Sequence, residues 1–182
     1  MFFVDASHFV RGTFLCCLWC VARVFVKAAA GRQRLNVRGA WNAVTHELVS
    51  VINTATVNAD TMCELLRKIA ALGLVGPHPE GTRLVLDNAK SQHAAAVKAL
   101  ATELGLHLEF LPGYSPNLNH IERRWKFLKR RALYGRDHPD FASFRTAIET
   151  EIEQLSTRHQ PAITSLMTLN FQTFENVSLL SA

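Results

Sequence analysis

Short apolar runs alternate with helix-like segments between residues 83 and 134, and this alternation is the strongest constraint on the fold. Residues 83–86 and 106–111 predict two strands, while 91–104 and 118–134 have the apolar spacing and the flanking breakers of helices. A strand–helix–strand–helix order implies parallel strands joined by right-handed crossovers. Functional sites in such sheets form where the parallel strands end.

The first half of the chain predicts a different arrangement of strands. Residues 32–42 and 47–56 predict two strands that are close enough in sequence to form a hairpin. Residues 2–4 predict a buried strand that ends at Asp5, and residues 14–26 fit a strand or a helix. The other predicted features are a helix over 59–72 capped by Asn58, a Ser91 cap for the helix over 91–104, and two helices over 140–155 and 161–174.

Three acidic residues stand where regular elements would deliver them to one site. Asp5 and Asp87 each follow a predicted strand, and Glu122 lies in the first turn of a predicted helix. Singly, each also fits an ordinary role, as a strand end, an Asx turn or an acid near a helix dipole. Together they match a two-metal phosphodiester site, because Mg²⁺ takes oxygen ligands and two ions about 4 Å apart can stabilise the attacking and leaving oxygens.

Positive charge is concentrated in residues 117–136, which hold seven basic residues and one acid, whereas the whole chain has a net charge of +5. The single acid is Glu122. A basic helix beside a candidate catalytic carboxylate indicates a polyanionic substrate such as nucleic acid, and the alternative is a solvated basic face. The candidate phosphate contacts are Arg123, Lys126, Lys129 and Arg130.

The cysteine and hydropathy patterns argue against a zinc or redox protein and against a membrane or secreted protein. Cys17 and Cys20 have CxxC spacing, but no second pair completes a zinc site, and with Cys16 they lie in an apolar run. We expect these cysteines and Cys63 to be small buried hydrophobes rather than a redox or metal site. No run approaches the ~18 apolar residues of a membrane span, and the N-terminus lacks a signal-peptide pattern, so we expect a cytoplasmic protein without a membrane partner.

Three motifs contain the acids: FFVDASHF, VLDNAK and LPGYSPNLNHIERRWKFLKRR. They resemble, in that order, the first-Asp strand, the second-Asp strand and the Glu helix of the DDE transposases of the mariner superfamily, in its bacterial insertion-sequence branch. The 34 residues between Asp87 and Glu122 match the spacing typical of that superfamily. The resemblance covers most of residues 1–135.

The resemblance implies an α/β, ribonuclease H-like mixed sheet. An antiparallel hairpin plus parallel βαβ strands would be flanked by helices, with a C-terminal helical tail. Residues 1–136 would form the catalytic domain, and residues 137–182 a helical extension packed on the same domain. Family members carry an N-terminal helix-turn-helix region, whereas this chain opens on the first catalytic strand. We therefore expect a catalytic domain alone, from a split or truncated reading frame.

The resemblance also implies the chemistry. Asp5, Asp87 and Glu122 would be the catalytic metal ligands for Mg²⁺ or Mn²⁺, with two ions bound, and Asn88 would support Asp87 by hydrogen bonding. The activity would be metal-dependent DNA cleavage and strand transfer at transposon ends, near the bacterial nucleoid. Two further partners stay open besides DNA: a second copy, or a separate chain supplying a helix-turn-helix.

Three other functions stay open. One is a resolvase or ribonuclease on the same fold, and another is a catalytically silent DNA-binding remnant. The third is a thiol-redox protein that uses Cys17 and Cys20.

Overall fold

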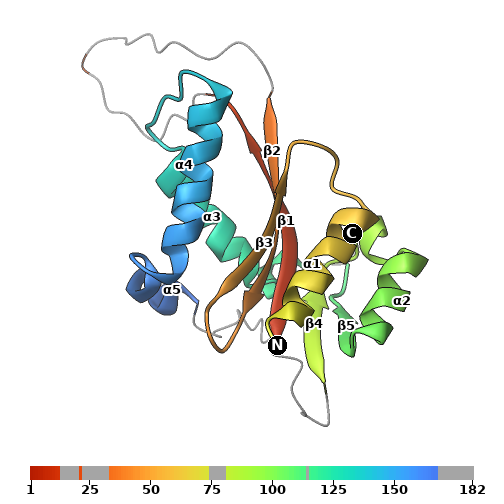
Figure 1. Cartoon of the computed structure of the whole chain (residues 1–182). Helices are drawn as coiled ribbons and strands as arrows, with labels where there is room; N and C mark the ends of the chain where they lie inside the picture. The colour runs from red at the N-terminus through yellow and green to blue at the C-terminus, as the bar shows by residue number, and fades with distance from the viewer. Residues whose placement is uncertain (13–20, 22–32, 74–80, 114, 168–182) are drawn as a thin grey trace, which may run out of the picture.

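The computed structural model describes residues 1–12, 21, 33–73, 81–113 and 115–167. Its centre is a five-stranded sheet with the order β3-β2-β1-β4-β5 (Figure 1). The strands are β1 (Phe2–Val10), β2 (Arg34–Asn42), β3 (Leu48–Asn53), β4 (Thr82–Leu86) and β5 (Leu106–Phe110). The helices are α1 (Ala59–Ala71), α2 (Ala95–Glu103), α3 (Ile121–Ala132), α4 (Phe141–Glu153) and α5 (Gln160–Leu166). Three short 3₁₀ turns are η1 (Lys90–Gln92), η2 (Pro116–Leu118) and η3 (Gln154–Ser156).

The sheet is mixed, with its two halves meeting at β1. The β2–β3 hairpin is antiparallel and pairs antiparallel with β1. On the other side of β1, the strands β4 and β5 are parallel to it. This confirms the predicted combination of an antiparallel hairpin with parallel βαβ strands.

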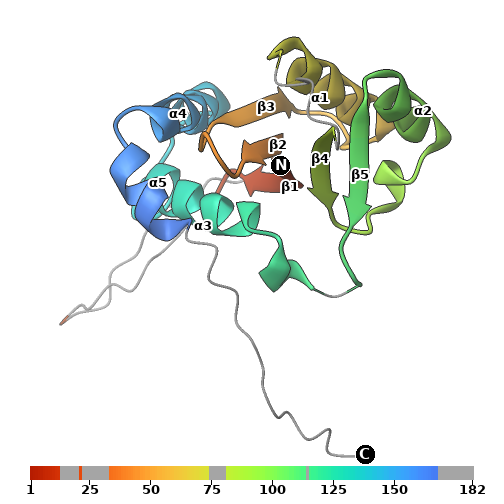
Figure 2. The ribbon, with the colours of Figure 1, turned by 90° about the horizontal axis from the view of Figure 1, so that it is seen from below.

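Helices cover both faces of the sheet. The alternation of side chains along β1 divides the core in two, because successive residues point to opposite faces. Phe2 and Val4 pack with residues of α1 and α2, whereas Phe3 and Phe9 pack with residues of α3, α4 and α5. Figure 2 shows α1 and α2 together on one side of the sheet, with α3 and α5 on the other.

Strand β1 continues well beyond the carboxylate that was predicted to end it. It pairs with β2 over its whole length, to Val10, but with β4 only as far as the Val4–Leu86 pair. Asp5 therefore lies within the strand, and the prediction of a strand end at Asp5 was wrong. From Asp5 onward, β1 still pairs with β2 along one edge but no longer pairs with β4 along the other. The edge of β1 beside Asp5 is therefore free of a neighbouring strand on the β4 side.

Helix α3 lies close to the sheet because a glycine lies beneath it. A Cβ on Gly39 would lie 2.7 Å from Cη2 of Trp125 and 2.9 Å from its Cζ2. Trp125 is buried, and its indole Nε1–H donates to Asp5 Oδ2 at 3.0 Å. Gly39 is the cross-strand partner of Asp5. The ring therefore lies over this pair of residues and holds α3 against the centre of the sheet.

The basic helix α3 also buries one of its arginines. Arg124 is 1% exposed, lies 5.5 Å from the centre of the Trp41 ring, and donates to the His46 carbonyl oxygen. Burial lowers the pKa of Arg124 to about 9. The sequence did not predict this anchor to the β2–β3 hairpin. The apolar face predicted for this helix is buried as expected: Ile121, Trp125, Leu128 and Ala132.

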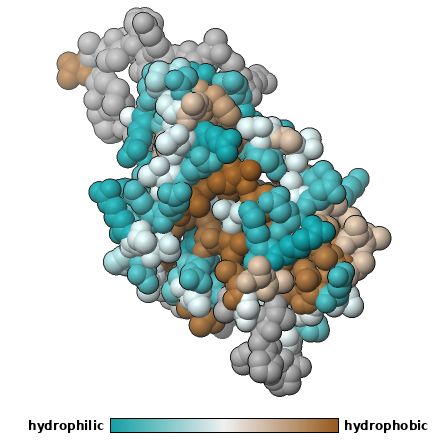
Figure 3. Space-filling view, viewed as in Figure 1, coloured by the Kyte–Doolittle hydropathy of each residue, from teal (hydrophilic) through white to brown (hydrophobic). Residues whose placement is uncertain are grey.

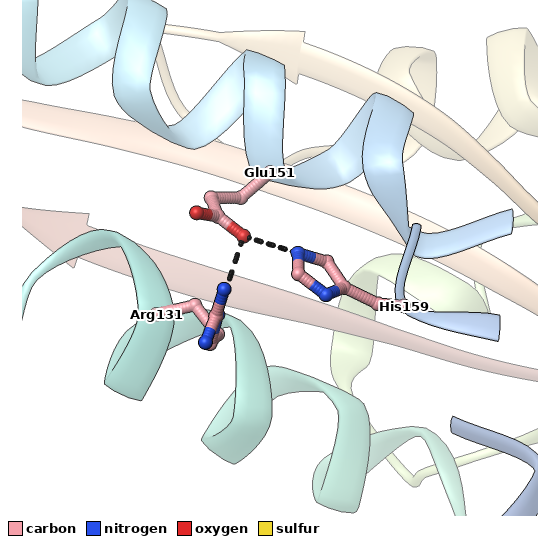
Figure 4. Close-up of polar contacts among 3 residues, drawn as sticks. All are labelled: Arg131, Glu151 and His159. Atoms are coloured by element: carbon pink, nitrogen blue, oxygen red, sulfur yellow. Dashed lines mark hydrogen bonds and ion pairs between the residues drawn. The ribbon is translucent and has the colours of Figure 1, made fainter. Parts of the chain in front are cut away.

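The C-terminal helices pack on α3 through an apolar core and a buried polar cluster (Figure 4). His159 donates from Nε2 to Glu151 Oε2 at 2.9 Å, and both side chains are largely buried. Arg131 Nε, on α3, lies 3.8 Å from the same carboxylate oxygen. Because a buried carboxylate needs partners, this cluster fixes the end of α4 and the start of α5 relative to α3.

Apolar side chains are visible between hydrophilic helices on one face of the molecule (Figure 3). They lie over the edge strand β3, where five of the six residues have intermediate exposure. The sheet edge formed by β3 is thus more apolar than the helical surfaces around it.

Two predicted helix boundaries were wrong. Ser91 lies in η1 and does not cap a helix, because α2 begins only at Ala95 after an extended Ala94. Helix α3 begins at Ile121 rather than near residue 118, because residues 116–118 form the tighter turn η2. The predicted Asn58 cap is confirmed, with a capping box to Thr61.

Some predictions fall on residues that the structure does not describe. These include almost all of 14–26, residues 168–174 of the helix predicted over 161–174, and Cys16, Cys17 and Cys20. The described helix α5 ends at Leu166, so that predicted helix was too long. Cys63 is buried and carries a free thiol, as expected. Among the described residues, no helix combines the length and apolar character that crossing a membrane requires.

The contact between Gly39 and Trp125 generates a stability prediction. Gly39→Ala should destabilise the fold by about 1–3 kcal/mol, because the new methyl meets a rigid buried ring. Trp125→Ala should cost about 3–5 kcal/mol by leaving a cavity. In the double variant the Gly39→Ala cost should largely vanish, because the obstructing ring is gone. Urea unfolding of the four proteins measures this coupling.

Gly12→Ala is the matched control, since nothing lies within 4 Å of a Cβ built there. If Gly39→Ala lowered the free energy of unfolding equally in the wild type and in Trp125→Ala, the close contact with the ring would not be the reason that residue 39 is a glycine.

Candidate active site

Asp5 lies on β1 and Asp87 follows the end of the neighbouring parallel strand β4. Val4 and Leu86 form the last pair between β1 and β4, and the two aspartates are the next residues along the chain. Neighbouring strands lie about 4.8 Å apart. The predicted convergence of these two acids therefore follows directly from the register.

The turn after Asp87 is tied to the end of β5. Asn88 Nδ2 donates to the Leu111 carbonyl oxygen at 2.6 Å, and its Oδ1 lies 3.2 Å from His93 Nε2. Asp87 Oδ1 accepts a long hydrogen bond of 3.4 Å from the backbone N–H of Ala89. Asn88 thus contacts the neighbouring loop and His93 rather than the Asp87 carboxylate, and it acts on Asp87 through the shape of the turn.

Glu122 enters from the first turn of α3, which Asn119 fastens to β1. Asn119 Nδ2 donates to the Val4 carbonyl oxygen at 3.1 Å, and the Asn119 carbonyl oxygen accepts from the N–H of Glu122 at 3.1 Å. One buried residue therefore links the backbone just before Asp5 to the backbone of Glu122. The sequence prediction missed Asn119, although an asparagine in a turn before a helix is a recognisable signal.

The three carboxylates line one pocket of about 240 Å³, at the edge where β4 leaves β1. They reach it from a strand, from a turn and from a helix that are far apart in the sequence. The other lining residues are Asn88, Ala89, Leu111, Pro112, Gly113, Ser115 and Asn119. The structure thus brings the three predicted acids together with the predicted supporting Asn88.

The electrostatics of the pocket are unfavourable to a full set of negative charges. Burial and the nearby charge of Glu122 raise the pKa of Asp5 to about 7, with a smaller contribution from Asp87. The N–H groups of Ala6 and Trp125 donate to Asp5 and partly oppose this rise. A site of this kind is stabilised by a proton or by a cation.

Arg38 is a buried cation that the sequence prediction missed. It lies on β2, is 3% exposed, and donates from Nη2 to the Ser91 hydroxyl at 3.3 Å. Burial lowers the pKa of Arg38, and the charges of Asp87 and Asp5 oppose that lowering. The guanidinium therefore offsets part of the negative charge of the two aspartates. No motif marks it, because its burial depends on strand pairing.

The donor set suits a hard divalent cation, but the carboxylates stand apart. In the described ranges, no three His, Cys, Asp or Glu side chains are close enough together to hold a metal ion as they are placed. Asp5, Asp87 and Glu122 share the pocket and are the residues of this site that could close on a cation.

The predicted phosphate contacts separate into two groups on α3. Arg123, Lys126 and Arg130 line a second pocket, which opens beside α5. Lys129 instead lies with its ammonium 5.5 Å from the centre of the Phe9 ring, toward β1.

Comparison with known proteins agrees with this geometry. A family described as the DDE superfamily endonuclease matches residues 2–145. Solved structures similar to the chain include the Mos1 strand transfer complex, with 16% identity, a TM-score of 0.60, and coverage of 92% of this chain and 55% of that one. No curated protein that was compared matches the sequence.

Two further similar structures are mariner Mos1 paired end complexes. The complex with Mn has 16% identity and a TM-score of 0.59, and the match covers 94% of this chain and 56% of that one. The complex with Mg has 17% identity and a TM-score of 0.59, and the match covers 92% of this chain and 55% of that one. At this identity the similarity establishes the ribonuclease H-like fold, and the chain spans a little over half the length of those proteins. Because the family match extends over most of the chain and includes the whole carboxylate pocket, the chain belongs to the DDE superfamily endonucleases.

Proposed function

We propose that this chain is the catalytic part of a transposase, which cleaves DNA at transposon ends and joins those ends to new DNA. One observation carries the proposal: Asp5, Asp87 and Glu122 line one pocket although three separate elements supply them. Membership of the DDE endonuclease family and a fold similar to Mos1 support it. The three sequence motifs support a place in the mariner superfamily, in its bacterial insertion-sequence branch.

The residues of the pocket fit a divalent cation such as Mg²⁺ or Mn²⁺. Three carboxylates and the Asn88 side chain offer oxygen ligands, which hard cations prefer. The raised pKa of Asp5 supports the same assignment, because a cation would offset the repulsion that raises it. Two ions bound by Asp5, Asp87 and Glu122 would stabilise the attacking and leaving oxygens of a phosphodiester displacement. The Mos1 complexes solved with Mn and with Mg support this choice of metal.

The reaction consists of two in-line displacements at phosphorus. Water attacks a phosphodiester at the transposon end, the P–O3′ bond breaks, and a 3′-hydroxyl is released. That hydroxyl then attacks a phosphodiester of the target DNA, and a new 3′-hydroxyl leaves. The protein mainly positions these groups.

Several residues keep the carboxylates in place for this chemistry. The Trp125 N–H fixes one oxygen of Asp5, and Asn119 sets the position of Glu122 relative to β1. Asn88 holds the turn after Asp87 against the end of β5. Arg123, Lys126, Lys129 and Arg130 would bind the DNA backbone beside the pocket.

The partners follow from the same proposal. A paired-end complex of the Mos1 transposase with a transposon end supports joint action at paired ends, and a second copy of this chain would be one partner in it. A separate chain with a helix-turn-helix region is the alternative. Residues 1–136 would be the catalytic domain and 137–182 a helical extension, acting at DNA in the bacterial cytoplasm.

A second candidate, a catalytically silent DNA-binding remnant, is favoured by the spread of the carboxylates in the described structure. A cleavage assay separates the two. The full chain should nick duplex DNA with Mg²⁺ or Mn²⁺ and lose this activity in EDTA. Asp87→Ala should lose more than the 10–100-fold that follows loss of groups supporting metal ligands.

Glu103→Ala, at an exposed acid on α2, is the control and should cleave as the wild type does. Wild-type protein that binds DNA without metal-dependent cleavage would favour the silent remnant. Equal cleavage by wild type and Asp87→Ala would rule out the proposed site.

The partly buried Asp5 carboxyl generates a prediction about pH and metal. Between its unfolded pKa of 3.8 and its folded pKa of about 7, the folded state binds more protons, so stability falls as the pH rises. The cost, on the order of 2–4 kcal/mol, is complete above about pH 7 in the absence of metal. Asp5→Asn should remove it, and thus stabilise the protein at pH 8 more than at pH 5.

Thermal or urea unfolding at the two pH values measures this difference. Mg²⁺ should raise the stability of the wild type at pH 8 and have a smaller effect on Asp5→Asn, since a ligand is lost. Glu103→Gln is the control and should keep the wild-type response. The same pH and Mg²⁺ responses in wild type and Asp5→Asn would contradict both the charge repulsion and the metal site.

The basic helix predicts a salt dependence of DNA binding. Lys126→Ala with Lys129→Ala should weaken binding uniformly across sequences and lower the slope of log K against log salt by about one per lysine. Stability should change by no more than the ~0.5–1 kcal/mol of the Lys129–Phe9 contact. Lys98→Ala, at an exposed lysine on α2, should leave the slope unchanged. An unchanged slope in the double variant would make α3 only a solvated basic face.

A further inference from the structure

A groove beside α5 combines the positive charge of α3 with the exposed ring of Tyr134, in the turn after α3. We call it the α3–α5 groove; its volume is about 330 Å³, within the ~300–1,000 Å³ of ligand pockets. Its lining residues are Arg123, Lys126, Phe127, Arg130, Tyr134 and Leu166. The two helices lie side by side in Figure 2, and Arg123 Nη1 donates to the Leu166 carbonyl oxygen at 3.3 Å across the groove.

The lining has two chemical parts. Arg123, Lys126 and Arg130 are cationic, and none of the described lining residues carries a carboxylate, so this part of the groove favours an anion. The same lining includes the rings of Phe127 and Tyr134 and the Leu166 side chain. Tyr134 is 43% exposed and Leu166 is 36% exposed, which places apolar surface in contact with solvent. A simple phosphate-binding face would not need these apolar side chains.

Cations beside an exposed aromatic ring are suited to single-stranded nucleic acid. Arginine and lysine follow the phosphates, while bases stack on aromatic rings with little sequence preference. In a duplex the faces of the bases are hidden in the stack, so Tyr134 would find no ring to cover. The apolar part of the groove therefore favours an unpaired strand over a duplex.

The position of the groove relates it to the carboxylate pocket. Arg123 follows Glu122 directly, and the lining residues of α3 and the turn after it extend from there to Tyr134. At 1.5 Å per helical residue this length is about 16 Å. A strand with one phosphate at the carboxylates would have its neighbouring nucleotides beside this row of cations.

Resting on the function proposed above, we propose that the α3–α5 groove binds an unpaired stretch of the DNA strand next to the phosphodiester being cleaved. Arg123, Lys126 and Arg130 hold its phosphates, and Tyr134 stacks on a base. Lys129 takes no part, because its ammonium lies toward Phe9 on the other side of α3. The substrate preferred by the groove is thus a DNA end with a frayed or single-stranded segment.

The test is equilibrium binding of a fluorescent oligodeoxynucleotide, single-stranded or in a blunt duplex, to the full chain in EDTA. Tyr134→Ala should weaken single-strand binding about 5- to 100-fold, the range expected for loss of one base stack. It should change duplex binding less than about twofold, because duplex bases do not reach the ring. Tyr134→Phe should restore single-strand binding, since the stacking face is kept.

Leu72→Ala is the matched control, because Leu72 is similarly exposed, at 46%, on the opposite layer of the fold. Unfolding of each variant in urea ensures that only folded proteins are compared. Equal effects of Tyr134→Ala on single-stranded and duplex DNA, or none on either, would overturn the proposal. The proposal would also be overturned if poly-glutamate displaced the oligonucleotide from the wild type and did so less well from Tyr134→Ala. That result would make an acidic protein segment the occupant of the groove.

The groove and the proposed function fail separately. Because binding is measured in EDTA, it does not depend on cleavage. If the chain cleaves DNA with metal but Tyr134→Ala binds single strands as the wild type does, the proposed transposase function stands and the proposed role of the groove is rejected. A Tyr134-dependent preference for single strands without cleavage supports the groove and rejects the catalytic proposal.

Discussion

The contact between Trp125 and the Asp5–Gly39 pair is the interaction on which the candidate site depends. The indole ring packs over Gly39, where a Cβ would approach to 2.7 Å, and its N–H holds an oxygen of Asp5. Packing and hydrogen bonding therefore act on the same side chain. Since Trp125 is one turn from Glu122 on α3, the ring that fixes Asp5 also sets the distance from which Glu122 faces it.

The carboxylates of the site repel one another, and the rest of the fold keeps them near one another despite this repulsion. Asp5 is partly buried near two other acids, and its pKa is raised to about 7 as a result. The surrounding structure limits the relaxation, because Asn119 ties the Glu122 turn to β1 and Asn88 ties the Asp87 turn to β5. Arg38 provides partial compensation for the charge of the two aspartates. Because the fold keeps these like-charged carboxylates around one pocket, a bound cation would offset their repulsion, which is consistent with the proposed metal-dependent chemistry.

Helix α3 serves three environments with its different faces. One face packs on the sheet through Trp125 and Leu128, and Arg124 extends that anchor to the β2–β3 hairpin. A second face brings Glu122 to the carboxylate pocket. A third forms the α3–α5 groove, whose aromatic and basic side chains give the proposed single-strand site its chemistry. The polar cluster of Arg131, Glu151 and His159 keeps α4 and α5 in position behind it (Figure 4).

The sequence by itself determined the mixed sheet, the order of its elements, the buried stripe of α3 and the three acids, because periodicity and breakers are local properties of the chain. It could not determine that β1 continues to Val10, since the β2 edge sustains it, or that Ser91 bonds Arg38 instead of capping a helix. It also missed Arg38 and Asn119, whose roles depend on strands and turns far away in sequence. The separation of Lys129 from the groove residues was likewise decided by packing around α3. Local pattern identified the three acids of the site, whereas its supporting residues, the burial of each group and the distances between charges arise only when distant segments meet.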